Sequence, residues 1–140
     1  MKRITYLVLM AIAALSLLSM TAFGQDISVT IDGEELVFDV QPQIIDERTM
    51  VPMRLIFESL GAEVDFNSET SVITATAGDR KIIMQLGERM MTIDGEELML
   101  DVPPQLVDGR SLVPVRAVAE AMLVRTYWDG ESRSVILERT

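Results

Sequence analysis

A six-residue motif, IDGEEL, occurs twice in the chain, at residues 31–36 and 93–98. A second motif, RxxVPxR, follows each copy, starting at Arg48 and at Arg110, so both motifs recur at the same interval of 62 residues. The 30 residues that begin with each IDGEEL copy are identical at 16 positions. A fixed period of this length indicates two copies of one supersecondary unit. Because each copy alone would be marginally stable, we expect the two to share one hydrophobic core.

The first 24 residues have the features of a secretory signal peptide. Lys2 and Arg3 form a short basic region, an apolar run covers residues 6–18, and residues 22–24 supply the small side chains that a signal peptidase reads. We therefore expect cleavage before Gln25. The alternative is an uncleaved membrane anchor, but the run is shorter than the roughly 20 apolar residues that span a bilayer. The sequence contains no later apolar stretch that could cross one.

The predicted mature chain, residues 25–140, is strongly acidic. The full chain has 12 basic and 22 acidic residues, and residues 1–24 contain two basic and no acidic ones, which leaves a formal net charge of −12. Phosphate binding needs a basic face, so we expect neither nucleic acid nor an anionic membrane surface as a partner. The chain has no cysteine and no histidine. Disulfides, thiolate chemistry and imidazole metal ligands are therefore not available to it.

Both copies have the pattern of an α+β unit. The first repeat, about residues 27–77, reads as two or three short strands, a helix and two more strands, or ββ(β)αββ. Alternating apolar and polar residues predict a strand at 27–31, and the following Asp-Gly pair predicts a tight hairpin turn. A second strand is predicted at 35–38. The second repeat, about residues 89–139, follows the same pattern, and the two are joined by turns that contain Gly78 and Gly87.

The helix of each copy begins at the proline of the Val-Pro-x-Arg motif. Pro52 fits the first helical turn, and apolar residues at helical spacing continue to about Leu60. Gly61 is suited to end this helix in the left-handed conformation. The second copy has Leu123 at that position, so we expect its helix, from Val115 to Met122, to end differently.

These motifs resemble the copper amine oxidase N-terminal-like (stalk) domain of secreted bacterial proteins. The residues of the paired motif are Asp39, Arg48, Pro52, Arg54 and Glu58 in the first copy and Asp101, Arg110, Pro114, Arg116 and Glu120 in the second. The resemblance covers nearly all of the mature chain and implies a twisted antiparallel sheet around short helices. It does not imply oxidase activity, because the chemistry of those enzymes belongs to other domains that use histidine copper ligands and a tyrosine-derived quinone.

The four motif arginines have two interpretations. Arg54 and Arg116 are predicted in a first helical turn, where the helix dipole disfavours a cation. Asp39 and Asp101 can each accept paired hydrogen bonds from an arginine, and we expect Arg116 to lie buried against Asp101. Glutamates one turn along the helix add only weak pairs. We interpret the arginines as structural clamps, and an anionic ligand site is the alternative.

Other candidate sites have simpler explanations. The acidic segments at residues 32–35, 94–97 and 129–131 lack the alternating oxygen ligands of a calcium loop, so hairpin turns account for them. Ten methionines invite a copper(I) site, but core filling is the favoured interpretation. No nucleophile motif is present, and without histidine a catalytic triad is excluded. We therefore expect no catalytic, cofactor-binding or metal-ligating residues.

The sequence thus predicts an exported, non-catalytic module that acts through its surface, at the cell envelope or outside the cell. Its expected partner is another protein or an envelope polymer, and the resemblance to a stalk domain also suggests self-association. The alternative function is a secreted small-ligand or divalent-cation binder that uses the acidic turns.

Overall fold

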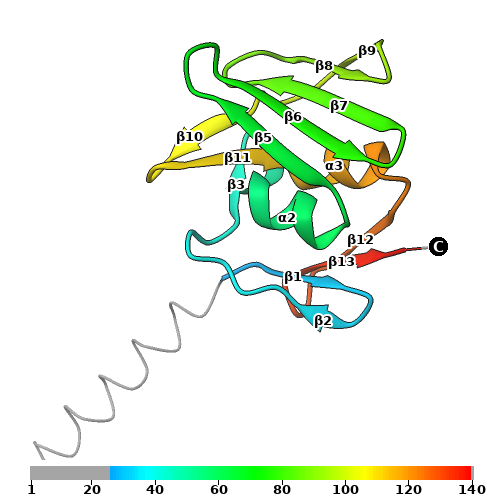
Figure 1. The fold of residues 1–140 in the computed structure, drawn as a ribbon. Helices are drawn as coiled ribbons and strands as arrows, with labels where there is room; N and C mark the ends of the chain where they lie inside the picture. Colours follow the sequence, from blue (N-terminus) through cyan, green and yellow to red (C-terminus); the bar gives the residue numbers. More distant parts are fainter. Residues whose placement is uncertain (1–25, 140) are drawn as a thin grey trace, which may run out of the picture.

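The computed structural model describes residues 26–139, and the predicted signal peptide lies outside the described residues. Within this range the chain forms thirteen strands and two short helices (Figure 1). The predicted α+β class is confirmed. Neither helix is long and apolar enough to cross a membrane, as far as residues 26–139 are concerned.

The strands form three sheets. Sheet A has the order β12 (Arg125–Asp129), β13 (Ser134–Glu138), β1 (Ser28–Ile31) and β2 (Glu34–Glu35). Sheet B has the order β10 (Gln105–Val107), β11 (Arg110–Pro114), β4 (Arg48–Pro52) and β3 (Gln43–Ile45). Sheet C has the order β5 (Glu63–Asn67), β6 (Val72–Ala77), β7 (Arg80–Gln85), β8 (Met90–Ile93) and β9 (Glu96–Met99). The helices are α2 (Met53–Ser59) and α3 (Val115–Ala121).

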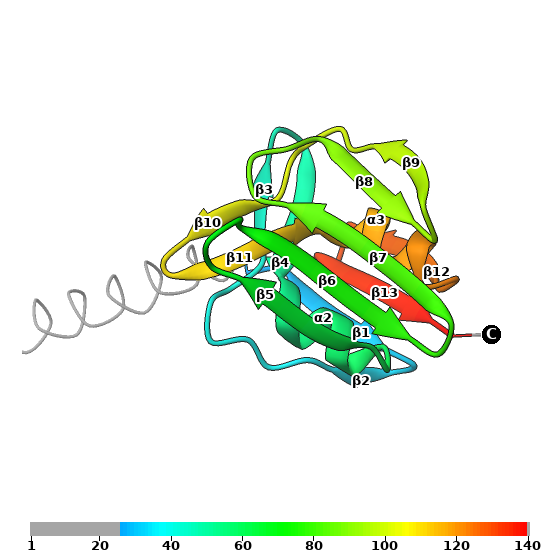
Figure 2. The same ribbon diagram turned by 45° about the horizontal axis from the view of Figure 1, so that its top comes forward.

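Strand pairing is antiparallel with one exception among the described strands. Strands β5 to β8 run side by side in sheet C, where turns 78–79 and 86–89 join β6, β7 and β8 as predicted (Figure 2). In sheet A, however, β1 pairs in parallel with β13, with Thr30 opposite Ile136. The expectation of a purely antiparallel sheet is wrong at this point, because this pair joins segments more than 100 residues apart, which no local pattern reveals.

The first hairpin turn forms as predicted, but its second strand does not. Asp32 and Gly33 have φ angles of 50° and 87°, the two positive values that a type I′ turn requires. Strand β2 ends at Glu35, well short of the predicted strand over residues 35–38. Beyond it, Val37 is 87% exposed while Phe38 is buried. This segment anchors one aromatic ring in the core without joining the sheet.

The two helices end in the same way, which corrects the expectation for the second one. In α2, the amides of Gly61 and Ala62 donate to the carbonyls two and three positions from the helix end, a Schellman motif. In α3, Leu123 and Val124 make the equivalent bonds, to Glu120 and Ala119. Leu123 adopts φ 60° to do so. The tertiary contacts of the neighbouring segments thus outweigh the strain of a left-handed leucine, about 1–2 kcal/mol.

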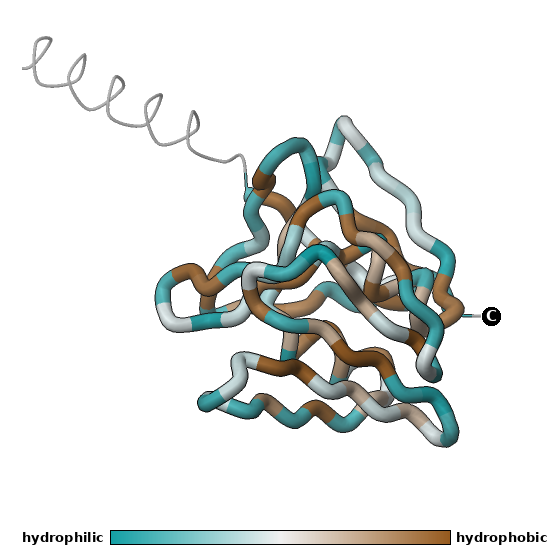
Figure 3. The backbone as a smooth tube through the Cα atoms, turned by 90° about the horizontal axis from the view of Figure 1, so that it is seen from above, coloured by the Kyte–Doolittle hydropathy of each residue, from teal (hydrophilic) through white to brown (hydrophobic). Residues whose placement is uncertain are grey.

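The main hydrophobic core lies between the sheets and includes both helices. In Figure 1, α2 lies between sheet C and the β1 and β13 strands of sheet A. Fully buried members come from both ends of the described chain, from Val29 in β1 to Leu137 in β13, with Phe57 of α2 among them. Figure 3 shows apolar stretches along the strands and hydrophilic residues at the turns. A smaller cluster forms around Met50, Leu112 and Val102.

The methionines of the described residues divide into two groups. Four fill the core as predicted: Met50, Met53, Met84 and Met91. Met90 and Met99 are instead 40% and 67% exposed, and they lie opposite each other on β8 and β9. Core filling is therefore wrong for this pair, because both side chains are on the outward face of an edge hairpin.

Candidate functional site

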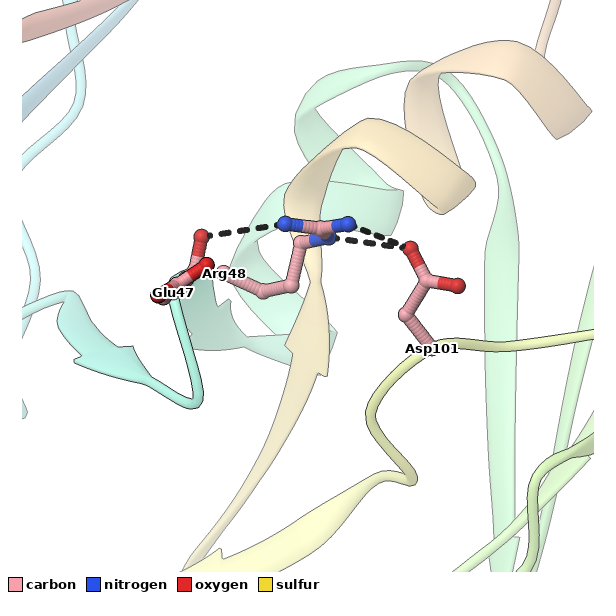
Figure 4. Close-up of polar contacts among 3 residues, drawn as sticks. All are labelled: Glu47, Arg48 and Asp101. Atoms are coloured by element: carbon pink, nitrogen blue, oxygen red, sulfur yellow. Dashed lines mark hydrogen bonds and ion pairs between the residues drawn. The ribbon is translucent and has the colours of Figure 1, made fainter.

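The motif arginines and aspartates form two ion pairs that cross between the copies. Arg48 of the first copy donates through Nε and Nη2 to Oδ2 of Asp101 in the second, at 3.0 and 2.6 Å. Figure 4 shows this pair, with Nη1 of Arg48 donating to the carbonyl of Glu47. In the reciprocal pair, Nε and Nη2 of Arg110 lie 2.9 and 2.7 Å from Oδ2 of Asp39. Each pair joins a hairpin of sheet B to a segment of the other copy.

This arrangement corrects the expected pairing of Arg116. Asp101 contacts Arg48 rather than Arg116, and the pair is exposed rather than buried, with 44% and 70% of the two side chains accessible. The Arg110–Asp39 pair is similarly exposed. Exposed ion pairs contribute only about 0.2–1 kcal/mol each. The pairs therefore fix the relative position of the segments more than they stabilise the fold.

Two carboxylates with arginine partners have altered acidity. The hydrogen bond from the Arg110 side chain lowers the pKa of Asp39 below its ordinary value. The side chain and backbone of Arg139 do the same for the pKa of Asp32. Both carboxylates stay ionised to lower pH in the folded chain than in the unfolded one.

The two helix arginines have different surroundings. Arg54 of α2 contacts Glu58 at 3.2 Å and donates to the carbonyl of Val64. Arg116, the corresponding residue of α3, has no hydrogen-bond or ion-pair partner within residues 26–139, although Glu120 lies one turn further along the helix. Arg116 is exposed. It is therefore the motif arginine whose charge is not used by the fold.

Arg116 lines a cavity of about 440 Å³, which we call the Trp128 cavity. Three elements build it: the β3–β4 hairpin with Arg48, the start of α3 with Pro114 and Arg116, and the edge strand β12. The remaining lining residues are Ile44, Glu47, Thr49, Val115, Thr126, Tyr127, Trp128 and Val135. The cavity thus combines apolar walls with two guanidinium groups and one carboxylate.

Strand β12 contributes aromatic rings and an unused hydroxyl to this cavity. Tyr127 and Trp128 remain 46% and 45% exposed. The hydroxyl of Thr126 is buried and has no hydrogen-bond partner among the described residues. A buried hydroxyl without a partner destabilises a fold by about 1–3 kcal/mol, so such groups are often found where a ligand or water completes the bonding. Sequence reasoning missed this cavity, because β12 lies far along the chain from the β3–β4 hairpin.

A second cavity, of about 650 Å³, has corresponding residues at intervals of 62. Pro52, Arg54 and Phe66 stand where the Trp128 cavity has Pro114, Arg116 and Trp128. We call it the Phe66 cavity. Its two arginines, Arg54 and Arg110, are both paired with carboxylates that line the same cavity. Its lining residues therefore carry no net charge, whereas those of the Trp128 cavity carry one net positive charge.

The acidic turns are occupied by contacts of the fold. Both oxygens of Asp32 accept hydrogen bonds from Arg139, and Asp94 accepts one from the amide of Lys81 at 2.7 Å. Asp129 accepts one from the amide of Glu131. Among residues 26–139, no group of three or more potential ligating side chains is placed to hold a metal ion.

Comparison with known proteins identifies the class of this fold. The profile of the family described as "Copper amine oxidase N-terminal domain" matches residues 30–137, most of the chain. The chain belongs to this family, a stalk-like, non-catalytic module. A curated relative from Brevibacillus choshinensis, named "Protease inhibitor", is 25% identical over 142 aligned positions. The alignment covers 94% of this chain but only 42% of that protein, so the chain spans less than half the length of its relative.

Proposed function

We propose that this protein is an exported, non-catalytic interaction module that binds another protein at the cell envelope or outside the cell. The observation that carries the proposal is the Trp128 cavity, where two exposed aromatic rings surround a cation that the fold does not use. Exposed tyrosine and tryptophan beside arginine is the composition of binding hot spots. Membership of a stalk-like family supports a binding role, and it also supports an extracellular location.

The domain organisation of the proposal is a signal peptide at residues 1–24 and a mature domain at 25–140. Within it, we propose that the repeats at about 27–77 and 89–139 are related by an approximate two-fold axis. The pairing of β4 with β11 supports this, because Val51 lies opposite Val113, its own counterpart 62 residues later. Strand β7 lies outside the correspondence and connects the two copies.

We also propose that Arg48 and Arg110 are structural clamps of this domain. Their crossed pairs with Asp101 and Asp39 support that role, since each ties one copy to the other. Arg54 and Glu58 form a local clamp on α2. Pro52 and Pro114 are the N-cap residues where each strand becomes a helix, and neither helix has a side-chain cap.

Binding by the mature protein is tested by capture followed by reconstitution. Immobilised protein is exposed to an envelope extract, and each captured macromolecule is purified and bound again in isolation. We expect one partner to bind again, to be lost with Trp128→Ala, and to be kept with Leu106→Ala, which removes an exposed apolar side chain of the Phe66 cavity. The absence of any partner that binds again after purification would refute the interaction role.

The alternative function, cation binding through the acidic turns, has less support. The carboxylates of Asp32, Asp94 and Asp129 already accept hydrogen bonds within the fold. We expect added calcium to leave the melting temperature nearly unchanged, because a ligand raises it only by binding the folded state. We likewise expect purification without stoichiometric copper, and no hydrogen peroxide from primary amines. One equivalent of copper that survives dialysis against a chelator would overturn the non-catalytic assignment.

The name of the Brevibacillus relative makes a protease one candidate partner. This candidate is examined with a panel of purified extracellular proteases and a slowly cleaved substrate. Inhibition that saturates with the mature protein, and that Trp128→Ala weakens, would identify the partner as a protease. No inhibition at concentrations up to about 100 μM would exclude the proteases tested.

A further inference from the structure

The Trp128 cavity differs from its counterpart in one respect that bears on ligand chemistry. Each cavity has an arginine at the start of a helix, but Arg54 is neutralised by Glu58 and Arg116 has no partner within residues 26–139. The second arginine of the cavity, Arg48, is committed to Asp101. Glu47 lines the cavity as well. The single excess positive charge therefore belongs to Arg116.

A free guanidinium on the surface of a chain with net charge −10 is a local exception. Long-range repulsion from the other acids is screened beyond about 8 Å at physiological salt, so the groups that line the cavity dominate for a bound ligand. Arginine presents a planar set of donors that matches a carboxylate. The hydroxyl of Thr126 lines the same cavity, and it supplies a donor that has no partner among the described residues.

The remaining walls specify what accompanies the carboxylate. Ile44, Pro114, Val115 and Trp128 are apolar, and no asparagine, glutamine or aspartate lines the cavity. Such walls suit an aliphatic or aromatic side chain, whereas a polysaccharide needs several hydrogen-bonding groups for its hydroxyls. A peptide offers a carboxylate and an apolar side chain within one or two residues of each other.

We propose that the Trp128 cavity binds an acidic side chain of a partner protein, carried next to an apolar residue on an extended segment. Arg116 forms the ion pair with the carboxylate, Thr126 donates a hydrogen bond to the same segment, and Trp128 packs against the apolar neighbour. The Phe66 cavity, whose arginines are already paired, does not bind this group. This inference rests on the proposed interaction role and names the chemistry of its partner.

The chain contains its own reporter for this site. Trp128 is the single tryptophan of the sequence, and it lines the proposed cavity. Binding of a ligand without tryptophan therefore changes an emission signal that comes from this cavity alone. The probe is a blocked tripeptide, acetyl-Leu-Glu-Leu-amide, and the matched control is the same peptide with glutamine in place of glutamate.

We expect the glutamate peptide to change Trp128 emission saturably, and the glutamine peptide to bind about tenfold more weakly, as loss of a charge-assisted hydrogen bond predicts. Arg116→Gln should weaken the glutamate peptide by the same factor and leave the glutamine peptide unaffected. Arg54→Gln, the matched change in the Phe66 cavity, should alter neither. Unchanged melting temperatures of the two exposed-site variants verify that both are folded.

Three results would overturn the inference. They are the absence of a saturable response up to about 10 mM peptide, equal affinity for the two peptides, and equal affinity of wild type and Arg116→Gln. The outcome is independent of the capture experiment. A partner that is captured equally well by Arg116→Gln overturns the acidic ligand but leaves the interaction role standing. Selective peptide binding without any captured partner does the reverse.

Discussion

Leu137→Ala tests whether the two copies unfold as one cooperative unit. Leu137 of β13 is fully buried in the main core, and its backbone pairs with Ile31 at the opposite end of the chain. Removing a fully buried leucine side chain costs about 2–5 kcal/mol. The total stability of a domain of this size is about 5–15 kcal/mol. The variant should therefore fold, with a melting temperature lower by about 10–20 °C.

The measurement uses two probes of the same thermal transition. Emission of Trp128 in β12 reports on sheet A, and far-ultraviolet circular dichroism reports on all three sheets. Both midpoints should coincide in the wild type and should fall together in Leu137→Ala. Leu106→Ala is the matched control, because the same atoms are removed from a side chain that is 65% exposed, and its midpoint should change little. Two separate transitions, or a fall seen only in Trp128 emission, would refute the shared core.

Four further outcomes follow from individual residues. Leu123→Gly should raise stability by about 0.5–1 kcal/mol in urea unfolding, because it relieves a left-handed leucine at a somewhat smaller entropic cost. Thr126→Val should raise stability by about 1 kcal/mol in the same assay, because it removes a buried hydroxyl without a partner among residues 26–139. A double-mutant cycle of Arg48→Ala and Asp101→Ala should give a coupling of about 0.2–1 kcal/mol, and a value above 2 would contradict the exposed geometry. The folded-state pKa of Asp39 is lowered, so its stabilising effect is complete above its unfolded pKa of about 3.9 and is lost as pH falls through the lower folded value; Asp39→Asn should therefore flatten the acid limb of the stability curve.

Local elements could be predicted from the sequence because their signals are local. The Asp-Gly turn at residue 32, the helix after Pro52 and the hairpins of sheet C all appear in the structure. The ending of α3 could not be predicted, because the chain beyond Leu123 imposes a conformation that leucine itself disfavours. The length of β2 was also wrong, since the core position of Phe38 removes that segment from the sheet.

Long-range contacts explain the rest of the difference. The motif identified Arg48, Arg110 and their aspartates as a set, but it could not say which copy supplies each partner. The Trp128 cavity was missed for a related reason. Its walls come from β4, α3 and β12, and its distinguishing feature is an arginine that lacks a partner within residues 26–139, which only coordinates reveal.

The parallel pairing of β1 with β13 also sets the order of events during synthesis. Strand β1 is the first strand to leave the ribosome, and its partner begins at Ser134, 106 residues later. Sheets B and C can assemble from the segments between them, but sheet A has no inner strand for β1 until the chain is nearly complete. Pairings between such distant segments slow folding. The nascent chain therefore keeps the apolar face of β1 uncovered until its last strand emerges, which makes the C-terminal strand the step that closes the core.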